Sequence, residues 1–242
     1  MTLAFTFDAD GSSAATLISG FVKIADVPTR PLSIVDIDGG TVGYMRVLWQ
    51  PPGGGLFGGS MGGLAAEFNY GGSECHTGLA GGAGLSEPGL WYWFSVAFGG
   101  WSTGGGGGIH GQMWGPHSIT SGPVTATMSP GTPSNSQQVD SNLGWGVNLS
   151  GSYDNMPNAS GYAMKDLWIV GGDGWQHADI ITPVTPPGSD PGALSGLGNL
   201  LYLCNQPLGA IPPGGHILDA FNPLSNLVPG PEGATIVADG PY

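Results

Sequence analysis

Charged side chains are scarce in this chain, since only 9% of its 242 residues are Asp, Glu, Lys or Arg. Soluble domains ordinarily carry about 25% charged residues. Four of the charged residues are basic and 17 are acidic, which gives a formal net charge of −13 at pH 7. Nucleic acids and anionic membrane surfaces are both recognised by clustered cations. We therefore expect no nucleic-acid partner and no membrane partner.

Long apolar runs and cysteine frameworks are missing as well. No uninterrupted apolar stretch reaches the roughly 18 residues of a membrane span. The first ten residues, Met1 to Asp10, lack a basic region and become acidic, unlike a secretory signal peptide. Cys75 and Cys204 are the only cysteines, and their spacing matches neither a disulfide framework nor a zinc site. A single disulfide and two reduced, buried thiols both remain open, and we favour the thiols.

Glycine is the residue in excess, at 47 of 242 positions, against about 7% in ordinary proteins. Its runs, Gly53–Gly63 and Gly104–Gly108, predict long surface loops because glycine readily adopts positive φ. Hydrophobic residues still make up 40% of the chain, enough for a sizeable core. A neutral, turn-rich surface repels neighbours weakly. The composition favours a subunit packed in a shell or lattice over a freely diffusing enzyme.

Short segments rich in β-branched and aromatic residues, bounded by Gly, Pro, Asp or Ser, predict an all-β fold. The most informative is Leu90–Phe98 (LWYWFSVAF), which is apolar on both alternating faces. We expect a central strand with Trp91 and Trp93 on one face and Tyr92 on the other. The predicted strands are Leu3–Phe7, Leu17–Ile24, Leu32–Ile37, Val42–Trp49, Leu90–Phe98, Val124–Met128, Leu143–Leu149 and Ala163–Val170.

The composition changes after residue 182. From Pro183 to Tyr242, Pro-Pro and Pro-Gly pairs alternate with brief apolar runs such as Leu197–Leu203. We expect a β-sandwich domain over residues 1–182 and a Pro/Gly-rich C-terminal arm over residues 183–242. The arm's apolar runs are too short to form their own core, so another surface must cover them. That surface is this chain's own sandwich or, as we favour, a neighbouring chain.

Several motifs follow one another in a distinctive order between about residues 85 and 182. They are Leu90–Phe98 (LWYWFSVAF), Gly108–Gly115 (GIHGQMWG), Leu143–Leu149 (LGWGVNL), Gly161–Val170 (GYAMKDLWIV) and His177–Ile180 (HADI). This order resembles the concanavalin-like or laminin-G-like jelly-roll β-sandwich. The resemblance implies an antiparallel jelly roll.

Modules of that kind also occur as accessory proteins of tailed-bacteriophage particles. The resemblance thus implies a non-enzymatic structural protein of the virion, such as a capsid decoration or head/tail fibre-type component. It would associate with itself and with other virion proteins, after assembly in the host cytoplasm. The resemblance also includes lectin-like modules, so binding of a host surface glycan is the alternative. Members that cleave glycans commonly carry E-x-D-x-E on one strand, which this chain lacks.

Three tryptophans beside Gly-rich turns, Trp101, Trp114 and Trp175, are candidates for stacking on a sugar ring. Tryptophan more commonly lies in a core or an interface, so both interpretations stay open. No cofactor other than Ca²⁺ is suggested by the sequence.

Two pairs of carboxylates form the candidate calcium ligands. Asp8 and Asp10, like Asp36 and Asp38, lie two residues apart and would share one face of a strand. Calcium takes six or more oxygens, which neither pair supplies alone. The motif D-x-D-G is also an ordinary ending of a strand before a turn, and we favour this second role.

Ser60 lies in a G-x-S-x-G motif that resembles the nucleophile elbow of α/β-hydrolases, with Gly63–Ala66 as the start of a helix. His177 or His216 would then be the base. The glycine and serine frequencies predict about one such motif by chance. Glu67, like Glu74 and Glu87, is an isolated acid, which does not favour a two-carboxylate glycosidase. We expect Ser60 in a loop and no enzymatic activity.

Overall fold

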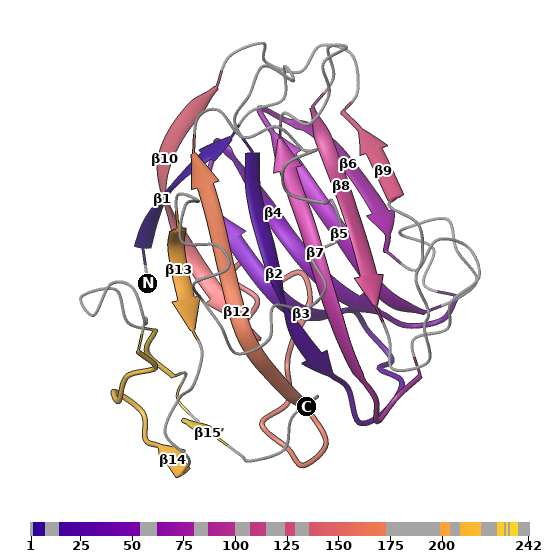
Figure 1. Cartoon of the computed structure of the whole chain (residues 1–242), viewed down its shortest axis with the longest axis vertical. Coiled ribbons are helices and arrows are strands. Elements are labelled where there is room, and N and C mark those ends of the chain that lie inside the picture. The colour runs from indigo at the N-terminus through magenta and orange to yellow at the C-terminus, as the bar shows by residue number, and fades with distance from the viewer. Residues whose placement is uncertain are drawn as a thin grey trace.

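The computed structural model describes residues 2–7, 15–53, 62–79, 87–99, 107–114, 124–128, 136–172, 199–203, 209–218, 227–229, 231 and 233–236. Every regular element within these residues is a β-strand, so the predicted all-β class is confirmed. No helix in this part of the chain is long and apolar enough to cross a membrane. The strands form two large sheets and one small two-stranded sheet (Figure 1).

The first sheet follows the order β1-β10-β3-β4-β5-β6, and neighbouring strands in this order are antiparallel. A short additional strand, β11, pairs in parallel with β3. The bounds are β1 Thr2–Phe7, β3 Leu32–Asp38, β4 Gly43–Gln50, β5 Gly63–Tyr70, β6 Ser73–Gly78, β10 Gln137–Trp145 and β11 Asp154–Asn155.

The second sheet follows the order β13-β12-β2-β7-β8-β9 and is antiparallel throughout. A separate two-stranded antiparallel sheet pairs β14 with β15. The bounds are β2 Ala15–Lys23, β7 Trp91–Gly99, β8 Gly108–Trp114, β9 Val124–Thr127, β12 Ala163–Gly172, β13 Asn199–Leu203, β14 Gly209–Ile211 and β15 Ala234–Ile236.

The two large sheets share one hydrophobic core, to which both contribute alternate residues of their strands. The Trp49 ring of β4 meets the Tyr92 ring of β7 edge-on, with centroids 5.7 Å apart. Phe68 of β5 contacts Phe98 of β7 in the same way at 5.9 Å. Because side chains from both sheets interdigitate here, the sheets pack face to face as a β-sandwich.

The prediction for Leu90–Phe98 is confirmed. β7 lies between β2 and β8, away from both edges of its sheet. Tyr92 points into the core, and Trp93, on the opposite face, is only 2% exposed. The Trp93 ring packs against Phe21 of β2, with centroids 4.7 Å apart. Trp91, at the start of the strand, is half-buried.

β5 was not among the predicted strands, and its first residues were a candidate helix after Ser60. Residues 63–70 instead pair with β4 on one side and β6 on the other. Leu64, Ala66 and Phe68 point into the core at alternate positions. Two flanking strands thus override the helical preference of the Leu-Ala-Ala sequence. The nucleophile-elbow interpretation loses its helix, and Ser60 itself lies outside the described residues.

β13 belongs to the segment that the sequence assigns to the C-terminal arm. It extends the second sheet by pairing with β12, and Leu201 and Leu203 are buried in the shared core. Ile217 and Leu227 form an isolated bridge and join the same core. For these residues the covering surface is this chain's own sandwich, contrary to our preference for a neighbouring chain.

Candidate functional site

Three charged residues lie side by side on the outer face of the first sheet. Arg46 of β4 is the direct cross-strand partner of Asp36 on β3 and of Glu67 on β5. Direct partners project from the same face of a sheet. The neighbours of Arg46 along its strand, Met45 and Val47, point into the core, so the three charged side chains point away from it.

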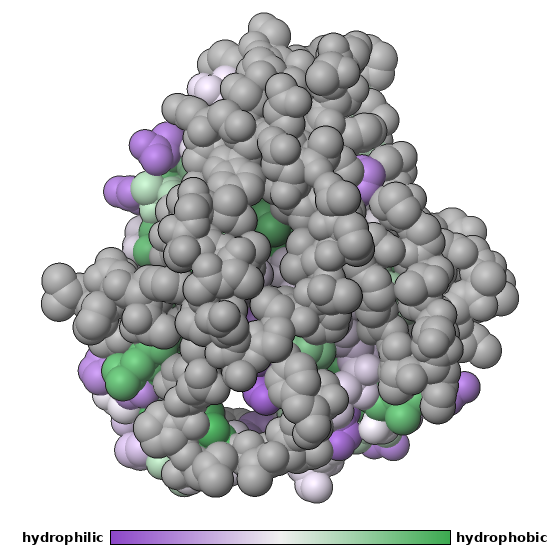
Figure 2. Space-filling view, viewed as in Figure 1, coloured by the Kyte–Doolittle hydropathy of each residue, from purple (hydrophilic) through white to green (hydrophobic). Residues whose placement is uncertain are grey.

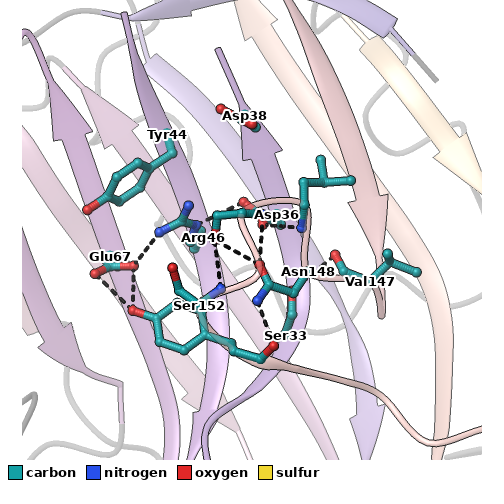
Figure 3. A network of polar contacts seen from close by, with 12 residues as sticks. Ser33, Asp36, Asp38, Tyr44, Arg46, Glu67, Val147, Asn148 and Ser152 are labelled. Carbon is teal, nitrogen blue, oxygen red and sulfur yellow. Dashed lines mark hydrogen bonds and ion pairs between the residues drawn. The ribbon is translucent and has the colours of Figure 1, made fainter. Parts of the chain in front are cut away.

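The guanidinium of Arg46 bridges the two carboxylates (Figure 3). Its Nε donates to Asp36 Oδ1 at 2.9 Å, and its Nη1 donates to Glu67 Oε2 at 3.1 Å. The ring of Tyr44 lies 3.7 Å from the guanidinium carbon. The side chains of Arg46, Asp36 and Glu67 are 6%, 0% and 7% exposed. Such a buried guanidinium is held in one orientation by its two planar partners.

A segment that follows β10 covers these charges, and we call residues 146–155 the cover segment. The Leu149 amide donates to Asp36 Oδ2 at 2.8 Å. The Tyr153 hydroxyl lies 3.1 and 3.0 Å from the two oxygens of Glu67 and donates to this carboxylate. Within the segment, the Asn148 side-chain amide donates to the Tyr153 carbonyl at 2.6 Å. Each buried carboxylate therefore ties the cover segment to the sheet. We call this set, Asp36, Tyr44, Arg46, Glu67 and Tyr153, the Arg46 network.

Two glycines let the cover segment fold back over the sheet. Gly144 is the partner of Asp36 in β10, and a Cβ added there would collide with the Val147 carbonyl oxygen. Gly146 has φ 69°, a conformation that favours glycine. The predicted strand Leu143–Leu149 therefore ends at Trp145, because the chain turns at Gly146.

The network holds two carboxylates and one guanidinium, so one negative charge is in excess when all three are ionised. Burial raises the pKa of Glu67 above its ordinary value, although Arg46 and Tyr153 act to lower it. Burial also raises the pKa of Tyr153 well above its usual range, and the nearby Glu67 adds to this shift. At neutral pH the Tyr153 hydroxyl therefore stays protonated and donates to Glu67.

The candidate calcium ligands Asp36 and Asp38 make different contacts in the structure. Asp36 binds Arg46 and the Leu149 amide. Asp38 accepts the Gly40 amide at 2.8 Å, the contact expected where a strand runs into a turn. No group of three or more His, Cys, Asp or Glu among the described residues is arranged to hold a metal ion. Asp36 therefore holds Arg46 and the cover segment, and Asp38 caps the turn after β3.

The remaining predicted residues fall into two groups. Cys75 is a buried, free thiol, and Trp114 pairs with Trp93 through the backbone of β8. Outside the described residues or side chains lie Asp8, Asp10, Ser60, Trp101, the Trp114 side chain, Trp175, His177 and Cys204.

In the sequence Arg46 is one of four scattered basic residues, and Glu67 is an isolated acid. A usable signal was present, because each of three apolar segments carries one charge at its centre, in IVDID, YMRVL and AAEFN. A charge inside a buried strand requires a partner of opposite charge. Because only one of these three charges is positive, the arginine is expected to bridge both acids.

No family model matches the chain, and no curated protein matches it.

Proposed function

We propose that this protein is a non-enzymatic structural subunit of a particle, built on a jelly-roll β-sandwich and acting through protein–protein contacts. The observation that carries the proposal is the use of the buried charges. Asp36 and Glu67, bridged by Arg46, hold the cover segment on the sheet. Carboxylates engaged in this way build structure, whereas a catalytic acid or base must reach a substrate proton.

The other basic residues are also engaged within the chain. Arg30 pairs with Asp154 at 2.9 Å, and the Lys23 ammonium lies 5.8 Å from the centroid of Trp91. Lys165 interacts electrostatically with Asp166. Because the cations are few and each interacts with another residue of this chain, the surface offers little electrostatic steering toward anionic partners. This supports assembly through neutral contacts.

The exposed apolar side chains are candidate contact points. Val27, Leu218 and Val228 are 52%, 49% and 56% exposed. Hydrophilic and hydrophobic residues alternate along the lower rim of the molecule, where described residues are visible (Figure 2). Scattered apolar positions of this kind suit several small contacts with neighbouring subunits.

The particle that we propose is that of a tailed bacteriophage, with the protein as a capsid decoration or a head/tail fibre-type component. This rests on the resemblance over residues 85–182. Its first four motifs supply residues to β7, β8, β10 and β12, which belong to both sheets of the sandwich. That arrangement supports a jelly-roll relationship.

Two measurements test the proposal. Sedimentation velocity of the full chain at low and high salt is expected to show self-association that changes little with ionic strength. Immunogold electron microscopy of particles from the native source is expected to label particle surfaces at regular positions. A strictly monomeric chain and unlabelled particles would refute the structural role. Glycan-array binding that is lost in Trp114→Ala would favour the lectin-like alternative, and fluorophosphonate labelling of Ser60 would favour a hydrolase.

A further inference from the structure

We propose that the Arg46 network takes up one proton at Glu67 when the medium becomes acidic, and that this uptake fastens the cover segment more firmly to the sheet. The proposal does not depend on the particle assignment. It predicts that acid strengthens this buried ionic cluster, the opposite of ordinary salt-bridge behaviour.

The charges of the cluster do not balance while all three groups are ionised. Asp36 and Glu67 contribute two negative charges, and Arg46 contributes one positive charge within hydrogen-bonding distance of both. All three side chains are at most 7% exposed. An uncompensated charge at this depth is costly because water cannot solvate it. Binding one proton makes the cluster neutral and removes that cost.

Glu67 is the carboxylate that can accept the proton and keep its contacts. Both oxygens of Asp36 already accept strong donors, from Arg46 and from the Leu149 amide. A proton on Glu67 Oε1 leaves Oε2 free to accept from Arg46. The Tyr153 oxygen, 3.1 Å from Oε1, then accepts the new carboxyl hydrogen, since a phenol oxygen both donates and accepts. The contact between Glu67 and Tyr153 is then kept with donor and acceptor exchanged, and the bond from the Leu149 amide to Asp36 is unchanged.

Glu67 is surrounded by charged and titratable groups on β3, β4 and β6 and in the cover segment. On β6, Glu74 adds a like charge that disfavours ionised Glu67. Glu74 also accepts the Tyr44 hydroxyl at 2.8 Å and lies 3.8 Å from His76 Nδ1. The groups are Asp36 on β3, Tyr44 and Arg46 on β4, Glu74 and His76 on β6, and Tyr153 in the cover segment.

The sign of the pH effect follows from linkage. In the folded protein the pKa of Glu67 lies above its ordinary value, while in the unfolded chain it is ordinary. The folded state therefore binds this proton more tightly. The resulting stabilisation is fully present below the ordinary pKa of glutamate, and it is lost as the pH rises through the raised pKa. Acidification through this window stabilises the folded state, in which the cover segment lies on the sheet.

Hydrogen exchange of the full chain, corrected for intrinsic rates, tests the effect on the cover segment. Between pH 7.5 and pH 4, protection of the Leu149 amide is expected to rise, by up to about tenfold for each unit of Glu67 pKa shift. The Glu67→Gln variant carries a neutral isostere, so its protection at pH 7.5 should match the acid value of the wild type and stay flat. His76→Gln serves as the matched control and should retain the pH dependence.

A second measurement needs no variant to fold. The Glu67 carboxyl carbon of the labelled wild-type protein, followed by NMR, should titrate with a midpoint above that of an ordinary glutamate. A midpoint at or below the ordinary value overturns the proposal. Protection that is flat or falls in acid, or a pH dependence that persists in Glu67→Gln, overturns it as well. Loss of the dependence in His76→Gln would assign the proton to the imidazole instead.

Discussion

Removal of the Arg46 guanidinium is the sharpest test of the structural role of the network. Arg46→Met keeps a long, unbranched side chain but removes the charge and its donors. Asp36, which is fully buried, and Glu67, which is 7% exposed, would then lie near each other without a counterion. The Tyr44 ring would also lose the cation that now lies 3.7 Å away.

The expected loss of stability is about 3–5 kcal/mol, because removing one partner of a buried ion pair leaves an uncompensated charge. Folded domains are stable by only about 5–15 kcal/mol, so the loss is a large fraction of the total. With a urea m-value of about 3 kcal/mol/M, the midpoint of unfolding should fall by roughly 1–1.7 M. The loss should shrink in acid, where the two carboxylates bind protons.

Arg30→Met is the matched control. Arg30 pairs with Asp154 at 2.9 Å, a distance equal to that of the Arg46–Asp36 pair, but its side chain is 60% exposed and that of Asp154 is 42% exposed. An exposed pair contributes only about 0–1 kcal/mol. Urea unfolding followed by tryptophan fluorescence at pH 7 compares both variants with the wild type. If Arg46→Met costs no more than Arg30→Met, the network does not hold the fold and our reasoning about it is wrong.

Three further predictions concern the core, the turn and the arm. Trp93→Ala should lower the free energy of unfolding by about 3–5 kcal/mol, measured by urea titration, because it empties a site that is only 2% exposed. Gly144→Ala should destabilise the chain and speed hydrogen exchange of the Leu149 amide, because the added Cβ collides with the Val147 carbonyl. Gly78→Ala is the control: no atom lies within 4 Å of its added Cβ, so it should change the free energy of unfolding by less than about 0.5 kcal/mol. A chain ending at residue 208 should unfold at a higher temperature than one ending at residue 182, because only the longer chain retains β13; equal melting temperatures would show that β13 contributes nothing.

One prediction concerns thiol chemistry. Burial raises the pKa of Cys75 to about 12, and the thiolate is the reactive form. N-ethylmaleimide at pH 7 should therefore leave Cys75 unmodified in the folded protein and modify it in urea, as read by peptide mass spectrometry. Rapid modification of Cys75 in the folded chain would show that the core packing around β6 opens readily.

The sequence by itself determined the fold class and most of the strands. Enrichment in β-branched and aromatic side chains along Leu32–Ile37 and Leu90–Phe98 is a local property, and it placed β3 and β7 correctly. The aromatic side chains on both faces of β7 also predicted its central position. These inferences succeeded because strand formation and burial follow the two-residue period of the backbone.

Other features were decided only by the tertiary structure. β5 reads locally as a helix, and it becomes a strand because β4 and β6 supply hydrogen bonds on both sides. β13 comes from a segment with the composition of an arm, but β12 offers it an open edge. In both cases the deciding contacts are with distant parts of the chain.

The Arg46 network shows the same division most clearly. The sequence presents Asp36, Arg46 and Glu67 as charges in three separate segments. Only the antiparallel register of β3, β4 and β5 brings them into one row, and only the turn at Gly146 lays Tyr153 over them. The sequence of a strand determines which face of the sheet a charged side chain occupies. The residue that lies opposite this charge depends on the register of the neighbouring strands, and that register is set by the pairing of the whole sheet.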